Sequence, residues 1–173
     1  MGSFVKNFKL KIIIAGEPGS GKSFIARAAD ACIPVREIGA SIGKISERFS
    51  DMSCEMMLIT WAITRGRPKD TTHLGHSAAA IIVCDLTKPK TVERAPVWAN
   101  SILRVAGDIP LFFVANNINL GTPEALNRFQ EEARTYNSPW FYIQSEDLDS
   151  VKELFRVISQ VLTERILNKK SAS

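Results

Sequence analysis

The chain has 173 residues, of which 45% are hydrophobic. A chain of this length forms one domain that buries about two-thirds of its unfolded surface, and its composition excludes an intrinsically disordered protein. Its 22 lysines and arginines exceed its 18 acidic residues, giving a net charge of +4, but the basic residues are scattered along the chain. We therefore expect no nucleic-acid partner.

The sequence gives no sign of a membrane span or of a secretory signal. Its longest apolar run, near residues 78–83, is far shorter than the ~20 residues that cross a bilayer. The last residues, 169–173, contain no cysteine for prenylation, and Lys6 stands where N-myristoylation favours a hydroxyl side chain. We expect a cytoplasmic protein without a stable lipid anchor.

Three cysteines and two histidines are present, and none of them stands at the spacing of a zinc site. No Cys-x-x-Cys pair occurs, and His73 and His76 have no second pair of ligands beside them. We interpret the cysteines as reduced thiols in apolar surroundings.

Short apolar runs and amphipathic segments alternate along the chain. The apolar runs predict strands at 8–15, 53–63, 78–84, 110–115 and 139–143. Helical patterns predict helices at 24–31, 91–106, 122–136 and 150–167. We expect residues 33–50 to form a loop or an edge strand, and the polar, basic residues 64–75 to form a loop.

Two of the expected helices carry informative prolines. Pro96 lies inside the 91–106 pattern, so it must stand in the first turn of a helix or kink it. Thr122-Pro123-Glu124 is typical of a helix start. The alternation as a whole predicts an α/β domain over residues 1–168, with a mostly parallel sheet covered by helices on both faces, followed by a short polar tail at 169–173.

Residues 16–23 match the pattern G-x-x-x-x-G-K-[ST] between the first strand and the first helix. Glycines in such a loop allow backbone N–H groups to point inward at phosphate oxygens. Lys22 would reach the β- and γ-phosphates, and the Ser23 hydroxyl would bind Mg²⁺. The expected phosphate-binding residues are Glu17, Pro18, Gly19, Ser20, Gly21, Lys22, Ser23 and Phe24.

Residues 80–120 carry a family resemblance. A strand ending at Asp85, a helix with Trp98 near its middle, and a strand running into Val114-Ala115-Asn116 occur in this order. With the C-terminal segment SVKELFRVISQVL, this stretch resembles the Ras superfamily of small GTPases, the Rab branch in particular. The resemblance runs from Lys9 to about Leu167 and implies a three-layer P-loop G domain. Such a domain binds GTP and GDP with Mg²⁺ and acts as a switch for protein partners.

The switch regions depart from the family pattern. No threonine occurs between Ser23 and Thr60 to serve as the switch I metal ligand, although Ser41 or Ser46 could substitute. After Trp61, no aspartate supports the metal's water, and Gly66 or Arg67 replaces the water-orienting glutamine. We therefore expect slow or absent GTP hydrolysis. Arg65 or Arg67 could act as an arginine finger in cis, and the alternative for both is a solvated basic loop.

By the same resemblance, protein effectors or regulators would contact the two switch regions. These regions correspond to residues 33–50 and 62–76.

The base-recognition motif is also altered, since the family's NKxD appears here as residues 116–119, Asn-Asn-Ile-Asn. Asn116 keeps the residue that braces the loops, whereas Asn117 is too short to lie over the base. Asn119 offers one acceptor and one donor where an aspartate accepts two hydrogen bonds from guanine. We expect weakened guanine selection and a better match to xanthine.

A second loop of the base site follows the last expected strand. Ser145, Glu146 and Asp147 stand where the family has Ser-Ala-Lys, and Asp147 could restore an acceptor. With Asn116, Asn117 and Asn119, these residues complete the expected base-binding set.

Two alternatives to a switch protein with weak GTPase activity stay open. One is a P-loop nucleotide kinase or ATPase, in which Asp85 would serve as the Walker-B carboxylate. The other is a pseudo-GTPase scaffold that keeps the loop only as structure.

Overall fold

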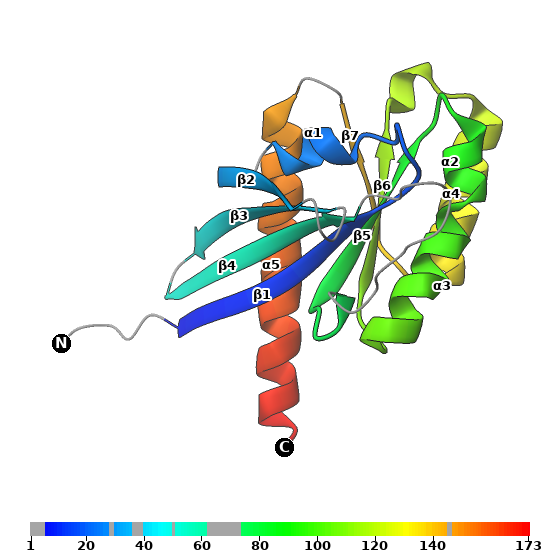
Figure 1. Ribbon diagram of the computed structural model, residues 1–173. Helices are drawn as coiled ribbons and strands as arrows, with labels where there is room; N and C mark the ends of the chain where they lie inside the picture. The colour runs from blue at the N-terminus through cyan, green and yellow to red at the C-terminus, as the bar shows by residue number, and fades with distance from the viewer. Residues whose placement is uncertain (1–5, 28–29, 36–39, 50, 62–73, 145–146) are drawn as a thin grey trace.

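A seven-stranded sheet forms the middle layer of the protein in the computed structural model, which describes residues 6–27, 30–35, 40–49, 51–61, 74–144 and 147–173. The strand order is β2-β3-β4-β1-β5-β6-β7 (Figure 1). The strands are β1 (Lys6–Ala15), β2 (Asp30–Val35), β3 (Ala40–Phe49), β4 (Met52–Trp61), β5 (Ala79–Asp85), β6 (Leu111–Asn116) and β7 (Trp140–Ile143). β1 pairs in parallel with β4 and β5, and β6 pairs in parallel with β5 and β7, while β2, β3 and β4 pair antiparallel.

Helices cover both faces of this sheet (Figure 1). α1 (Lys22–Ala26) and α5 (Leu148–Ser171) pack on one face, through Ile25 and the apolar stripe of α5. The opposite face carries α2 (Pro89–Glu93), α3 (Ala95–Ala106) and α4 (Pro123–Thr135). The expected mostly parallel sheet with helices on both faces is therefore confirmed.

The central strands are buried along their whole length because helices lie on both sides of them. All seven residues of β5 and all six of β6 are buried, as expected for parallel strands with near-continuous apolar sequence. In β1, Ile12 and Ile14 join the core beneath α5, while Ile13 joins the core beneath α3 and α4. This packing fixes the register that brings the strand ends together.

Both proline signals in the helices are confirmed. The expected helix 91–106 is divided into α2 and α3, and Pro96 lies in the first turn of α3, where its missing N–H costs no helical hydrogen bond. Thr122 caps α4, since its hydroxyl accepts a hydrogen bond from the N–H of Ala125 at 3.1 Å, and Pro123 opens that helix.

The expected helix at 24–31 is confirmed only over residues 24–26 and is too long at its C-terminal end. α1 ends at Ala26, and the strand β2 begins at Asp30. The alanine-rich sequence favours a helix locally, but pairing of β2 with β3 overrides that preference. Pro34 is compatible with this outcome because β2 is an edge strand, where a missing N–H is tolerated.

Within residues 33–50, the edge-strand expectation is confirmed by the end of β2, whereas β3 lies one position in from the edge, between β2 and β4. The expected loop at 64–75 lies mainly in 62–73, outside the described residues. At the C-terminal end, α5 runs to Ser171, so residues 169–171 of the expected polar tail form the last turn of a helix.

None of the helices in the described part of the chain combines the length and the apolar content that a bilayer crossing requires. Cys54 and Cys84 are buried free thiols. Burial raises the pKa of Cys54 to about 11 and also raises the pKa of Cys84. Both thiols are therefore protonated at neutral pH, as expected for structural cysteines.

Candidate functional site

The loop after β1 and the loop after β5 meet at the carboxyl edge of the sheet. β1 and β5 are neighbours, yet the chain leaves β1 toward the face of α1 and leaves β5 toward the face of α3. Such a divergence opens a crevice at the strand ends, which is where open α/β sheets bind ligands. The expected phosphate-binding loop, residues 16–23, lies at this point.

Two glycines in the loop are required by its geometry. Gly16 has a φ of 149°, and a Cβ there would lie 2.4 Å from the backbone oxygen of Val83 in β5. Gly21 has a φ of 108°, and a Cβ there would lie 2.4 Å from Nδ2 of Asn116 at the end of β6. The loop is therefore pressed against the ends of two central strands, at positions that only glycine fits.

Lys22 folds back over the loop. Its ammonium donates hydrogen bonds to the carbonyl oxygens of Gly16 at 2.6 Å and Glu17 at 2.8 Å. The side chain is buried, and this desolvation lowers the pKa of Lys22 to about 8, against the opposing effect of the Glu17 charge. The ammonium also lies 5.9 Å from the centre of the Trp98 ring, within cation–π range.

The loop presents hydrogen-bond donors that the described structure does not use. Ser20 N–H donates to the Glu17 carbonyl oxygen, and the N–H groups of Phe24 and Ile25 donate to that of Gly21. Among the described residues, no acceptor pairs with the backbone N–H groups of the loop and first helical turn, which belong to Gly19, Gly21, Lys22 and Ser23. Unpaired N–H groups that surround one lysine form a set of donors suited to an anion.

The hydroxyl of Ser20 adds a further unused polar group, because it is buried and has no partner among the described residues. A buried polar atom without a partner is costly unless a ligand or water satisfies it.

Glu17 ties the loop to α3. Its Oε1 accepts hydrogen bonds from Nε of Arg94 at 2.8 Å and from Nε1 of Trp98 at 3.1 Å. The Glu17 side chain is largely buried, with 13% exposure, so the Arg94 ion pair is better shielded from solvent than an ordinary surface pair. Trp98 therefore contacts the loop from α3, which lies within the helix expected at residues 91–106.

The loop after β5 contacts residues 16–23, the expected phosphate loop, from the other side. Lys88 donates from Nζ to the Gly19 carbonyl oxygen at 2.8 Å and lies 3.4 Å from Oδ2 of Asp85. Oδ1 of Asp85 accepts hydrogen bonds from the N–H of Thr87 at 2.9 Å and from its hydroxyl at 2.6 Å.

Asp85 is consequently a structural carboxylate. Burial acts to raise its pKa, but the hydrogen bonds from Thr87 and Asn117 and the charge of Lys88 outweigh burial and leave the pKa of Asp85 below its ordinary value. The ionised carboxylate therefore connects the loops after β5 and β6, and through Lys88 it reaches the phosphate loop.

The base side of the site is more open. Asn116 is buried, with Nδ2 3.5 Å from the Ser20 carbonyl oxygen and Oδ1 accepting from the N–H of Asn117 at 3.0 Å. These contacts agree with a bracing role. Beside them lies a hollow of about 200 Å³, whose lining residues are Asn117, Ile118, Asn119, Leu120 and Gln144.

The remaining expected site residues are placed as follows. Pro18 and Ser23 are exposed, and Phe24 is half-buried against the core beneath α5. Asp147 caps α5, because Oδ1 accepts hydrogen bonds from the N–H groups of Asp149 at 3.1 Å and Ser150 at 3.4 Å. Its carboxylate therefore stabilises the helix start.

Several expected functional residues fall outside the described residues, namely Ser145, Glu146, Arg65 and Arg67. Of the expected switch regions, residues 36–39, 50 and 62–73 also fall outside them. Ser46, one expected substitute for the switch I threonine, is exposed on β3.

Residues at the site that were not predicted from the sequence include Thr87, Lys88, Arg94 and Gln144. The spacing Asp85-Leu86-Thr87 is a detectable signal, because an aspartate commonly accepts a hydrogen bond from the residue two positions later in a turn. Lys88, Arg94 and Gln144 reach the site only through the packing of separate elements, so no local pattern identifies them.

No protein-family model matches this chain. The fold and the site together define an α/β protein with a glycine-rich, lysine-containing loop at the divergence of two central strands.

Proposed function

We propose that this chain is a small-GTPase-like nucleotide-binding protein whose phosphate loop is residues 16–23. The observation that carries the proposal is the joint arrangement of Lys22 and the unpaired backbone N–H groups of the loop. A diphosphate would satisfy these donors and the buried ammonium together, because each phosphate offers several acceptor oxygens. Residues 17–24 would thus contact the phosphates.

The buried state of Lys22 supports a phosphate ligand in particular. Burial lowers the pKa of the ammonium to about 8 in the ligand-free chain. A phosphate beside the ammonium would favour its charged form and return the pKa toward its ordinary range. Nucleotide binding would therefore offset a cost that the ligand-free protein carries.

The hollow next to Asn117 and Asn119 is the best place for the base. It adjoins the phosphate loop through Asn116, whose amide lies between Ser20 and Asn117. Because Asn119 replaces an acceptor-only side chain, guanine would bind with weaker selection than in the family, and xanthine would fit at least as well.

Lys88 is a positioning residue in this proposal. Lysine has three N–H donors, and two directions are used by Gly19 and Asp85. Its contact with the Gly19 carbonyl would hold the loop in place, and its ammonium would add a second positive charge beside the phosphates. We expect it to slow nucleotide release.

Magnesium fits the site only in company with the nucleotide. The Ser23 hydroxyl is exposed at the start of α1, and in the described part of the chain no three His, Cys, Asp or Glu side chains gather into a metal site. Ser23 and phosphate oxygens would therefore hold Mg²⁺, which would neutralise phosphate charge.

Hydrolysis is expected to be slow or absent. The Asp85 carboxylate is occupied by Thr87, Lys88 and Asn117, so it is poorly suited to a Walker-B role. This observation favours a switch or a pseudo-GTPase scaffold over a nucleotide kinase or ATPase.

Protein partners would bind the switch regions 33–50 and 62–76.

The direct test is titration of the purified chain with GDP, GTP, XTP and ATP, with and without Mg²⁺, followed by a turnover assay. Binding of guanine or xanthine nucleotides with slow turnover supports the proposal. Preference for ATP with phosphoryl transfer to a small acceptor would replace it with a P-loop kinase. Absence of binding to all four nucleotides would leave a structural scaffold as the remaining interpretation.

A further inference from the structure

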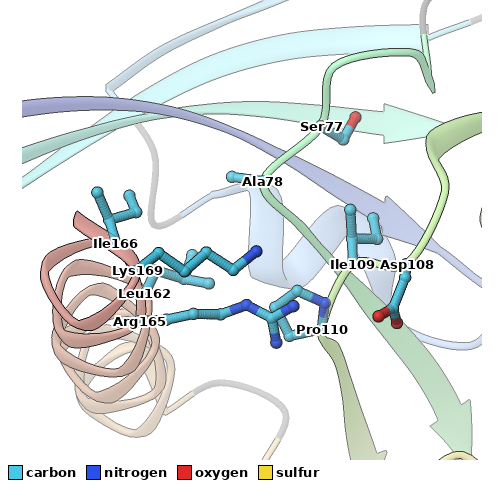
Figure 2. A pocket seen from close by; sticks show the side chains of 9 residues that line it. All are labelled: Ser77, Ala78, Asp108, Ile109, Pro110, Leu162, Arg165, Ile166 and Lys169. Atoms are coloured by element: carbon cyan, nitrogen blue, oxygen red, sulfur yellow. The ribbon is translucent and has the colours of Figure 1, made fainter. Parts of the chain in front are cut away.

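A second pocket lies at the opposite end of the sheet from the phosphate loop. It has a volume of about 210 Å³ and opens between the last turns of α5 and the segments that lead into β5 and β6 (Figure 2). β5 spans seven residues, so the pocket lies roughly 20 Å from the carboxyl edge at ~3.3 Å per residue. The pocket is therefore a separate feature from the proposed nucleotide site.

The floor of this pocket is apolar. It is formed by Ala78, Ile109, Pro110, Leu162 and Ile166. The one hydroxyl in the lining, that of Ser77, is already used, because it donates a hydrogen bond to the Leu74 carbonyl oxygen at 2.6 Å. An engineered apolar cavity of ~150 Å³ holds benzene, so this pocket has room for a branched aliphatic or aromatic side chain.

The rim of the pocket carries charges of both signs. Figure 2 shows Arg165 and Lys169 extending from α5 toward the segment before β6, where Asp108 stands. Among the described residues, neither cation forms an ion pair with Asp108 or with any other carboxylate. Opposite charges therefore share one opening without neutralising each other.

The arrangement of the two cations is not explained by helix stability alone. Arg165 and Lys169 are four residues apart on one helix face, where like charges are slightly destabilising. A cation stabilises a helix end mainly within the last turn, and Arg165 lies more than one turn before Ser171, the last residue of α5. Lys169 and Lys170 both lie in that last turn, so the helix end explains the position of Lys169 but not that of Arg165.

We propose that this pocket binds a free α-amino acid with an apolar side chain. The carboxylate would pair with the Arg165 guanidinium and the Lys169 ammonium, since the planar guanidinium matches a carboxylate in two hydrogen bonds. The ammonium group would pair with Asp108, and the side chain would cover the apolar floor. A zwitterion is the simplest ligand that uses both charges and the floor together.

The test is a titration of the full chain with L-leucine, monitored through the backbone amide NMR signals of residues 77–78, 108–109 and 162–169. Saturable shifts in these signals are expected with L-leucine. N-acetyl-leucine lacks the ammonium and leucinamide lacks the carboxylate, so each is expected to bind about tenfold more weakly or worse. No saturable shift with L-leucine, or equal binding of the three compounds, would overturn the proposal.

Variants assign the charges to the residues. Arg165→Gln should weaken L-leucine binding about tenfold, while Lys170→Gln, a control on the same helix outside the pocket lining, should leave it unchanged. Asp108→Asn should weaken L-leucine and remove its advantage over N-acetyl-leucine. Unchanged L-leucine binding in Arg165→Gln and Asp108→Asn would contradict the assignment, and an unchanged unfolding midpoint would show that each variant is folded.

Discussion

On the phosphate side of the proposed site, the buried Lys22 side chain donates two hydrogen bonds, and Glu17 accepts hydrogen bonds from Arg94 and Trp98. On the base side, Asn119 is exposed at the mouth of a hollow. The first region has its geometry set by the packing of α3 and the central strands. The second is a hollow at the surface whose lining includes the polar side chains of Asn117, Asn119 and Gln144. We infer that this chain would draw affinity from the phosphates and only modest selectivity from the base.

The same comparison separates positions where a substitution would alter base recognition from positions where it would disturb packing. A replacement at 119 would change which base fits, whereas a replacement at 117 would also remove the hydrogen bond that Asn117 donates to the Asp85 carboxylate. A replacement at Gly16 or Gly21 would instead meet β5 or Asn116. The strictest steric constraint therefore lies at the glycines of the loop, apart from Asn119.

The largest expected effect is the loss of stability caused by Gly16→Ala on the phosphate side of the proposed site. The new Cβ would meet the Val83 carbonyl at 2.4 Å, so we expect the free energy of unfolding to fall by about 4 kcal/mol or more. The matched control is Gly107→Ala, which also has a positive φ but no atom within 4 Å of the added Cβ. The control should lose about 1–3 kcal/mol, because its backbone conformation is one that essentially only glycine adopts. Equal losses in denaturant unfolding would show that the loop is not pressed against β5.

The pH dependence of stability tests the buried lysine. The pKa of Lys22 is lowered from 10.5 to about 8 by burial, so the unfolded chain binds more protons than the folded chain between these values. The destabilisation caused by the buried charge is complete below pH 8. It declines as the pH rises toward 10.5, so the free energy of unfolding should rise by about 3 kcal/mol in total.

Lys22→Met should remove this contribution to the pH dependence, and denaturant unfolding of both proteins from pH 7 to 10 measures the difference. Identical pH profiles for the ligand-free wild-type and Lys22→Met proteins would contradict a buried ammonium at this position.

Asn119→Asp tests which base the proposed site selects. An aspartate accepts two hydrogen bonds from guanine and repels the carbonyl of xanthine, so the ratio of GDP to XDP affinity should rise about tenfold or more. The control is Asn137→Asp, an exposed asparagine at the end of α4, away from the base hollow. Competition binding measures the ratio, and an unchanged ratio in Asn119→Asp would place the base elsewhere.

The smallest expected effect is that of Lys88→Met on nucleotide release. The variant keeps the aliphatic stem but loses the contact with the Gly19 carbonyl and the charge. Because Lys88 is about half exposed, solvent screening limits the effect to roughly a threefold to tenfold faster release. Lys90→Met, an exposed lysine on α2, should release nucleotide at the wild-type rate. Equal release rates in both variants would show that Lys88 does not help to hold the nucleotide.

The layered fold could be predicted from the sequence because its signals are local. The apolar runs of β5 and β6 and the Thr122 cap are contained within a few consecutive residues. α1 was predicted too long, since the alanines after Ile25 favour a helix while the strand β2 depends on a partner, β3, that lies later in the chain. Long-range pairing of this kind leaves little trace in local propensity.

The same distinction applies to the site. The loop 16–23 is recognisable because its spacing is fixed by the backbone alone. The contacts of Glu17 with Arg94 and of Lys88 with Gly19 join residues about 70 positions or more apart. These contacts depend on how α3 and the end of β5 pack beside β1, so they could be identified only in the folded structure.

The most direct test of the proposed phosphate loop is a titration with fluorescent GDP and Mg²⁺, comparing the wild-type chain with Lys22→Ala and with the surface control Lys90→Ala. Lys22 donates two buried hydrogen bonds within the loop and would contribute its charge to the phosphates. We predict saturable binding by the wild-type and control proteins, and at least about a hundredfold loss of affinity in Lys22→Ala. Equal affinity in all three proteins would contradict nucleotide binding by this loop.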